Sequence, residues 1–153
     1  MEEKEKRLIL IGRSLAGKTT LCQYLVHEEL DYHKTQSVQI INDIMIDTPG
    51  ELLERTRQRG ALLVTAADAD YIVFVQQADE AGTMFPPGFS SAFGGKPCIG
   101  IVTKSDLAAK RQIEFAKAML KTAGAEQVFV TSSYEGTGFD ELVQFIIEKG
   151  VKL

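Results

Sequence analysis

Apolar residues along the chain occur in short runs, and these runs alternate with amphipathic segments and polar turns. Four runs predict strands of a sheet, at residues 8–11, 71–75, 98–102 and 127–130. Apolar positions three and four residues apart predict helices at 20–27, 107–123 and 139–149, and the charged start of 51–67 predicts a mobile segment that leads into a further helix. Because strands and helices alternate, the pattern predicts an α/β fold with a mainly parallel sheet covered on both faces.

Two shorter runs, at 37–41 and 44–46, predict a pair of strands at the edge of this sheet. The first run alternates apolar and polar residues, and the turn Asn42-Asp43 separates it from the second. Two strands joined by so short a turn must run antiparallel. The sequence therefore predicts one antiparallel edge strand on the parallel sheet.

Two of the predicted helices have a defined inward face. In the segment 107–123 that face carries Ile113, Ala116, Met119 and Leu120. Gly124 is expected to end this helix, because glycine readily adopts the left-handed conformation that follows a last turn. In the last helix, at 139–149, the residues expected to point inward are Leu142, Val143, Ile146 and Ile147.

The segment 81–97 contains seven Gly or Pro residues among three phenylalanines, and so it cannot form a continuous helix. Within it, Phe85-Pro86-Pro87-Gly88-Phe89 predicts a stiff, shaped loop. Its aromatic rings either fold back on the domain as a small satellite core or stand exposed as a docking surface. For Phe89 we predict exposure, so that Phe89→Ala costs about 1 kcal/mol or less and removes the binding of a partner.

Length and composition indicate one ordinary globular domain over residues 1–153. The net charge of −4 gives no basic footprint for nucleic acid, and no apolar stretch is long enough to span a membrane. The charged N-terminus has no apolar core of a signal peptide, so the expected compartment is the cytoplasm. Cys22 and Cys98 form no ligand pattern and are expected to be reduced, buried residues.

The segment Gly12-Arg13-Ser14-Leu15-Ala16-Gly17-Lys18-Thr19 matches the phosphate-loop pattern G-x-x-x-x-G-K-[ST]. It follows a predicted strand and precedes a predicted helix, which is the context that a phosphate cradle requires. Its backbone N–H groups and the positive end of the helix would bind a di- or triphosphate. We assign nucleotide contacts here to Gly12, Ser14, Ala16, Gly17, Lys18, Thr19 and Thr20. Lys18 would bind the β- and γ-phosphates, and the Thr19 hydroxyl would ligate Mg²⁺.

Asp47-Thr48-Pro49-Gly50 follows a predicted strand, as does Thr103-Lys104-Ser105-Asp106. In the first segment, Asp47 would hold Mg²⁺ through water and the Gly50 N–H would meet the γ-phosphate, although the same residues also make a good turn. In the second, the Asp106 carboxylate would accept two hydrogen bonds from the guanine edge; its alternative role, shared with Ser105, is the N-cap of the next helix. A backbone N–H from Thr131-Ser132-Ser133 would lie near the guanine O6.

Together these motifs make the chain resemble a Ras-type small G domain, a three-layer P-loop NTPase fold, over nearly its whole length. Further stretches resemble the EutP/PduV family, the ethanolamine- and propanediol-utilisation proteins associated with bacterial microcompartments. Those stretches are 34–36, 46–51, 64–70, 85–89 and 102–107. The resemblance implies about six strands and five helices, GTP or GDP with Mg²⁺ at the strand ends, ATP as the alternative nucleotide, and Thr35 as a switch ligand of Mg²⁺.

Two residues depart from the small G domain pattern. Thr103 stands where an asparagine is usual, which loses a carboxamide beside Lys104 and Asp106 and would relax selectivity for guanine. Glu51 stands where a glutamine usually orients the attacking water, and its carboxylate both accepts a proton from water and repels the γ-phosphate. We therefore expect slow hydrolysis, with Lys18, Glu51 and Thr35 as the catalytic residues.

Three functions fit these residues. The first is a slow regulatory or assembly GTPase whose loops at 28–36 and 50–60 order with GTP. The second is an ATP-dependent phosphotransferase to a small carboxylate, because the resemblance carries an acetate-kinase assignment. The third is a non-enzymatic, nucleotide-gated adaptor that docks on a microcompartment shell protein or enzyme. The sequence identifies no acceptor site and no oligomeric state.

Overall fold

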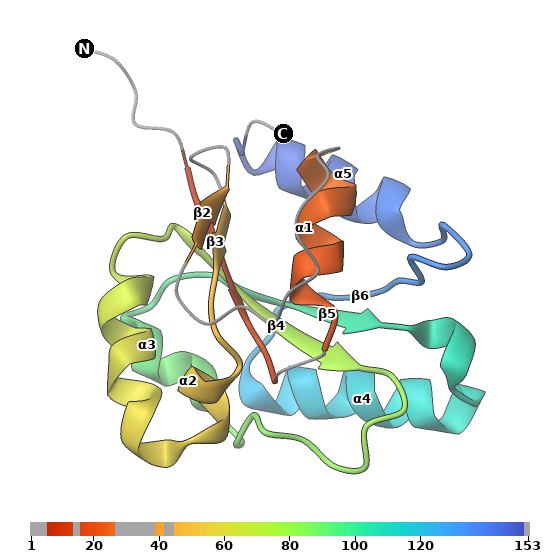
Figure 1. The fold of residues 1–153 in the computed structure, drawn as a ribbon, viewed down its shortest axis with the longest axis horizontal. Helices are drawn as coiled ribbons and strands as arrows, with labels where there is room; N and C mark the ends of the chain where they lie inside the picture. The colour runs from red at the N-terminus through yellow and green to blue at the C-terminus, as the bar shows by residue number, and fades with distance from the viewer. Residues whose placement is uncertain (1–5, 14–15, 27–38, 42–44, 152–153) are drawn as a thin grey trace.

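The computed structural model describes residues 6–13, 16–26, 39–41 and 45–151. A six-stranded sheet runs through the middle of the molecule in the order β2-β3-β1-β4-β5-β6 (Figure 1). Its strands are β1 (Leu8–Ile11), β2 (Gln39–Ile41), β3 (Met45–Asp47), β4 (Tyr71–Gln77), β5 (Cys98–Thr103) and β6 (Val128–Val130). Only β2 pairs antiparallel among these strands, with Ile40 opposite Ile46. The predicted α/β fold with one antiparallel edge strand is confirmed.

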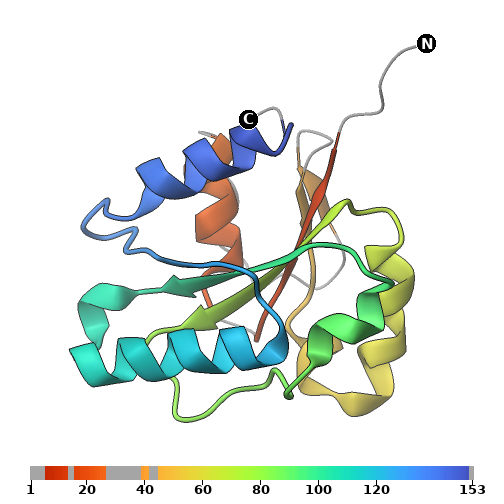
Figure 2. The same ribbon diagram turned by 180° about the vertical axis from the view of Figure 1, so that it is seen from behind.

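Helices cover both faces of the sheet, as Figures 1 and 2 show from opposite sides. On one face lie α1 (Lys18–Val26) and α5 (Phe139–Glu148), and on the other lie α2 (Glu51–Glu54), α3 (Arg59–Ala66) and α4 (Lys110–Ala123). Among the described connections there are three short 3₁₀ helices: η1 (Thr56–Gln58), η2 (Phe89–Phe93) and η3 (Ser105–Leu107). Each face therefore has its own hydrophobic cluster, and the sheet separates the two.

Several predicted boundaries and faces are wrong in detail. The helix predicted from residue 107 begins at Lys110, because residues 105–107 turn as a 3₁₀ helix and Ala108 is extended. Gly124 follows its last residue, as predicted. Ile147 is 54% exposed rather than inward, because the buried stripe of α5 is formed by Phe139, Leu142 and Ile146. In the segment 51–67 the predicted further helix is α3, and the stretch before it, predicted as a mobile segment, forms the short helices α2 and η1.

Cys22 and Cys98 are free thiols in the two hydrophobic clusters, as the sequence predicted. Burial raises the pKa of Cys22 well above its usual value, and burial raises the pKa of Cys98 to about 11. Both side chains therefore stay protonated at neutral pH, and a protonated thiol is a poor nucleophile.

The segment 81–97 folds back onto the sheet and packs its aromatic rings around Phe74 of β4. Phe85 and Phe93 are buried, and the partly buried ring of Phe89 lies 5.6 Å from the Phe74 centroid and edge-on to Phe93 at 5.3 Å. The guanidinium carbon of Arg59 lies 5.9 Å from the Phe89 centroid. The predicted exposure of Phe89 is therefore wrong, and the satellite-core alternative describes this loop.

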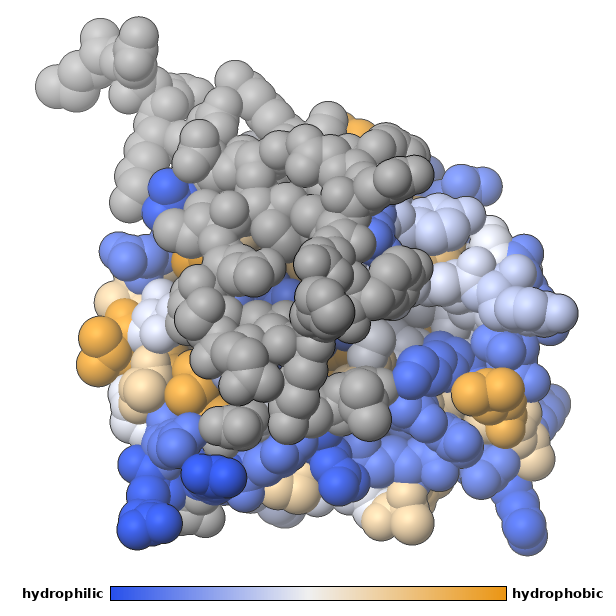
Figure 3. All heavy atoms as spheres, viewed as in Figure 1, coloured by the Kyte–Doolittle hydropathy of each residue, from blue (hydrophilic) through white to orange (hydrophobic). Residues whose placement is uncertain are grey.

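Figure 3 shows one face of the molecule, where the described apolar side chains form only small, separate patches among polar ones.

Because Phe89 belongs to this cluster, we expect Phe89→Ala to lower the free energy of unfolding by about 2 kcal/mol. Urea unfolding would measure the loss. Phe115 on α4 is 44% exposed, and Phe115→Ala serves as the matched control with an expected loss of less than about 1 kcal/mol. Equal losses of unfolding free energy in the two variants would show that the Phe89 ring is exposed, as the Phe115 ring is.

Candidate functional site

The candidate site is formed by loops that follow the carboxyl ends of parallel strands. The phosphate loop follows β1, Asp47 ends β3, residues 103–106 end and follow β5, and residues 131–133 follow β6. In an open parallel sheet these ends share one edge, where ligands bind in α/β proteins. All four motifs singled out in the sequence therefore lie at the same edge.

The phosphate loop needs glycine because β4 lies directly beside it. A Cβ added to Gly12 would lie 2.6 Å from the carbonyl oxygen of Val75, which is closer than such atoms approach. Gly17 has a φ of +96°, a value that side chains disfavour. Helix α1 begins at the next residue, so that its positive end faces the loop. Ser14, which the sequence assigned to nucleotide contact, lies outside the described residues.

Lys18 is held across the mouth of the phosphate loop. Its ammonium donates hydrogen bonds of 2.8 Å to the carbonyl oxygens of Gly12 and Arg13, and the side chain is buried. Burial lowers the pKa of Lys18, and the Asp47 carboxylate opposes that shift. Backbone carbonyl groups of the loop thus hold the ammonium in position.

Thr19 and Asp47 bring two side-chain oxygen atoms together beside the loop. The Thr19 hydroxyl donates to Asp47 Oδ2 at 3.0 Å, and Asp47 is fully buried. The neighbouring Thr48 hydroxyl donates to the Leu10 carbonyl at 2.7 Å, which fixes the end of β3 against β1. Among the described residues no three His, Cys, Asp or Glu side chains form a metal cluster. One carboxylate and one hydroxyl fit Mg²⁺, which takes its other ligands from phosphates and water.

Thr103 connects β5 to the phosphate loop, and Lys104 connects the end of β5 to the end of β4. The buried Thr103 hydroxyl donates to the Ala16 carbonyl at 2.5 Å, and the Lys104 ammonium donates to Gln77 Oε1 at 3.1 Å. Lys104 is the one non-glycine residue with positive φ, at 57°, in the described part of the chain. A Cβ on Gly17 would lie within 4 Å of both side chains. The hydroxyl that replaces the usual carboxamide therefore still anchors the loop.

Asp106 is exposed, but a buried serine orients its carboxylate. The Ser132 hydroxyl donates to Asp106 Oδ1 at 2.6 Å, and Ser132 itself is completely buried. The N-cap of α4 is Ala109, so neither Ser105 nor Asp106 has the capping role considered above. Sequence reasoning assigned Ser132 and Ser133 only to a backbone contact with the base, and it missed the hydroxyl of Ser132. Ser133 is exposed beside it.

Some of the remaining predicted site residues lie outside the described part of the structure. Thr20 is in the first turn of α1, and Gly50 is buried immediately before α2. The backbone of Glu51 begins α2, but its side chain lies outside the described part of the structure. Thr35 and the whole loop 28–36 also lie outside the described residues. Roles for these residues therefore rest on the sequence.

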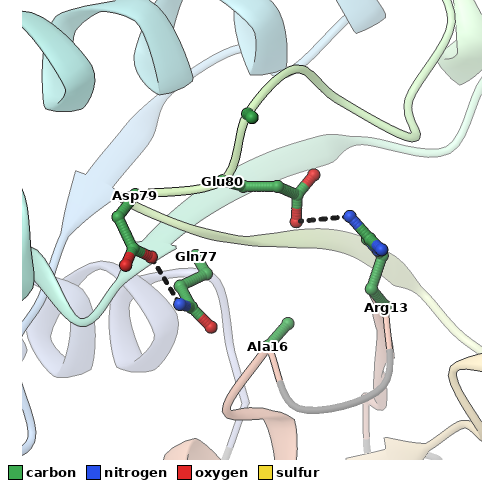
Figure 4. Close-up of a pocket in the computed structure, with 6 residues that line it drawn as sticks. Arg13, Ala16, Gln77, Asp79 and Glu80 are labelled. Atoms are coloured by element: carbon green, nitrogen blue, oxygen red, sulfur yellow. Dashed lines mark hydrogen bonds and ion pairs between the residues drawn. The ribbon is translucent and has the colours of Figure 1, made fainter.

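A cavity of about 280 Å³ lies beside the phosphate loop and was not predicted. In Figure 4, Arg13 and Glu80 point toward each other across it, with 3.9 Å between Nη1 and Oε1. Burial raises the pKa of Glu80, and the Arg13 guanidinium opposes that shift. Gln77 and Asp79, which hydrogen-bond to each other, also line the cavity. The strand order could have indicated this cavity, because β4 is the neighbour of β1 and the residues after β4 therefore lie beside the phosphate loop.

No helix among the described residues is long and apolar enough to cross a membrane.

The family model described as "Ethanolamine utilisation - propanediol utilisation" matches residues 5–148. The propanediol utilization protein PduV of Citrobacter freundii is 44% identical over 144 residues, which are 94% of this chain and 95% of that protein. The "Probable acetate kinase EutP" of Escherichia coli (strain K12) is 30% identical over 141 residues, or 92% of this chain and 89% of that protein.

Two solved structures share the fold. The translation elongation factor SelB of Methanococcus maripaludis, in complex with the GTP analogue GppNHp, has a TM-score of 0.72 and 22% identity. That match covers all of this chain and 36% of SelB. The Roco2 RocCORdC structure of Methanosarcina barkeri, bound to GDP, has a TM-score of 0.64 and 21% identity, covering 97% of this chain and 50% of that one. This chain thus spans about a third to a half of these larger proteins.

Proposed function

Since the chain belongs to the PduV–EutP family of ethanolamine- and propanediol-utilisation proteins, we propose that it is a guanine-nucleotide-binding P-loop protein that hydrolyses GTP slowly. The proposal extends to a role in the cytoplasm beside a bacterial microcompartment, with a shell protein or an enzyme as partner. The family description supports the link to ethanolamine or propanediol utilisation.

One observation carries the choice of guanine: the 2.6 Å hydrogen bond from Ser132 to Asp106. It holds one carboxylate oxygen and leaves the carboxylate exposed at the sheet edge. A carboxylate accepts from the N1–H and N2–H₂ groups of guanine, whereas adenine presents an acceptor at N1. The arrangement therefore favours GTP and GDP over ATP.

The phosphate end of the site supplies charge and positioning. Lys18 would contact the β- and γ-phosphates, while Thr19 and Asp47 would hold Mg²⁺. The metal would neutralise charge that develops on the phosphates. Thr35 is proposed to ligate Mg²⁺ in the triphosphate state, and Glu51 to position or activate the attacking water. A carboxylate at Glu51 also repels the γ-phosphate, which accounts for slow turnover.

A second candidate is phosphoryl transfer from ATP to a small carboxylate. The name "Probable acetate kinase EutP" of the Escherichia coli relative favours this candidate for the same phosphate cradle. In that reaction a carboxylate oxygen would form a bond to the γ-phosphorus, the bond to the β–γ bridging oxygen would break, and ADP would leave. A nucleotide-gated adaptor without turnover is the third candidate, and it keeps the same nucleotide site.

Product analysis separates the three candidates. The protein would be incubated with GTP or ATP, with Mg²⁺, and with or without acetate, and the products identified by phosphorus NMR. The proposed function predicts GDP and inorganic phosphate from GTP at a rate that acetate leaves unchanged. Acetyl phosphate formed from ATP would establish the phosphotransferase instead, and tight GTP binding without any turnover would establish the adaptor.

A further inference from the structure

Tyr134 has a side chain that is 90% exposed, more than any other large hydrophobic side chain among the described residues. Tyr24, by contrast, stacks on Phe139 with 3.8 Å between ring centroids. Single exposed aromatics are common on protein surfaces, so exposure alone does not indicate a function. The position of Tyr134 in the fold is the informative feature.

The loop that carries Tyr134 is tied down on both sides. Ser132 and Thr137 form an isolated bridge with two backbone hydrogen bonds of 3.1 Å, and the Gly136 N–H donates to the Ser132 carbonyl at 2.8 Å. The Glu135 N–H donates to the Ser132 hydroxyl oxygen at 3.1 Å. These bonds form a closed turn, and Tyr134 lies at its tip. The exposed ring is therefore presented by a well-bonded turn.

The same serine connects this turn to the proposed base site. Ser132 donates its hydroxyl proton to Asp106, the residue proposed to read the guanine edge, and Tyr134 is two residues further along the chain. A base held by hydrogen bonds to its edge keeps two apolar faces that water solvates poorly. An aromatic ring on the turn that orients the edge-reading residue can cover one of these faces.

We infer that Tyr134 stacks on the base of the bound nucleotide. This inference rests on the proposed function and adds an affinity determinant to its site. Stacking on an aromatic side chain stabilises a bound base by an amount that corresponds to roughly tenfold in affinity, and it tolerates any base because every base has a π face. Tyr134 thus supplies affinity, and Asp106 supplies the choice of base.

The affinity test compares wild type, Tyr134→Ala and Tyr134→Phe by calorimetric titration with GDP and with IDP. We expect Tyr134→Ala to bind both nucleotides about tenfold more weakly, and Tyr134→Phe to match wild type because it keeps the ring. Glu135→Ala in the same turn is the matched control and should bind like wild type, since only its exposed side chain is removed. Equal GDP affinity in wild type and Tyr134→Ala would overturn the inference while leaving the proposed function intact.

A spectroscopic test uses the absence of tryptophan from the chain. In Tyr134→Trp the new indole is the single tryptophan, and a stacked guanine should quench its fluorescence strongly. Pyrophosphate fills the phosphate loop without a base and should leave the signal unchanged. Quenching by GDP alone supports stacking, and equal responses to GDP and pyrophosphate would contradict it. If wild type bound pyrophosphate but no GDP, the proposed guanine function itself would fail.

Discussion

Lys18→Ala is expected to weaken GTP binding by about 100-fold or more while the protein stays folded. The ammonium is the charge that would contact the β- and γ-phosphates, and losing charge-assisted hydrogen bonds to phosphate costs about 3 kcal/mol. The fold should tolerate the change, because within the described part of the chain the ammonium bonds only to the Gly12 and Arg13 carbonyls of the loop itself. Calorimetric titration with GTP and thermal unfolding would measure the two effects separately.

Lys96→Ala is the matched control for this experiment. The Lys96 ammonium also donates to two backbone carbonyls, those of Ala66 at 2.7 Å and Ala67 at 3.1 Å, but these lie at the end of α3. Its removal should lower stability slightly and leave GTP affinity unchanged. If Lys18→Ala bound GTP as tightly as this control does, the phosphate-loop assignment would have to be abandoned.

The strand pattern could be predicted from the sequence because buried parallel strands carry continuous apolar runs. The runs that contain Ile9, Val73 and Ile101 place β1, β4 and β5 side by side in the middle of the sheet. The motif positions followed from the same pattern, because each motif comes directly after a strand. Sequence order and strand ends were therefore sufficient to bring the phosphate loop, Asp47 and Asp106 to one edge.

The sequence predictions that were wrong concern side-chain burial and helix ends, which depend on tertiary contacts and local turns. Phe89 follows two prolines and a glycine, so no periodicity indicates which way its ring points; its contacts with Phe74, Phe93 and Arg59 leave it partly buried. Leu107 reads as the first turn of a helix, yet it is 60% exposed at the end of η3. Helix ends are set by local turns and caps, which an apolar pattern does not specify.

The Ser132–Asp106 contact was missed for a related reason. The two residues are 26 positions apart, and each had been given a separate role toward the base. The pairing of β5 with β6 brings the loops after these strands together. Their proximity could have been predicted from the strand order, but the hydrogen bond between the side chains depends on the turn that the Ser132–Thr137 bridge closes.

Asp106→Asn should change which base the protein prefers. The new amide places an N–H donor where the carboxylate accepted from guanine, so GTP affinity is expected to fall by about 100-fold, since the loss of two hydrogen bonds to a charged group costs about 3 kcal/mol. XTP carries a carbonyl oxygen at C2 that accepts from the amide, and its affinity should rise. Competition of GTP, XTP and ATP against a fluorescent nucleotide would measure the preference of each protein.

Ser132→Ala is the graded control for the base preference. It removes the hydroxyl that orients Asp106 and keeps the carboxylate, so GTP affinity should fall severalfold while GTP remains preferred over XTP. A carboxylate that reads guanine therefore predicts an inversion of preference in Asp106→Asn and only a weakening in Ser132→Ala. The contrary result is that wild type binds ATP as tightly as GTP and that neither variant changes the ratio of the two affinities. That result would show that Asp106 does not recognise the base, and it would favour the ATP-dependent phosphotransferase.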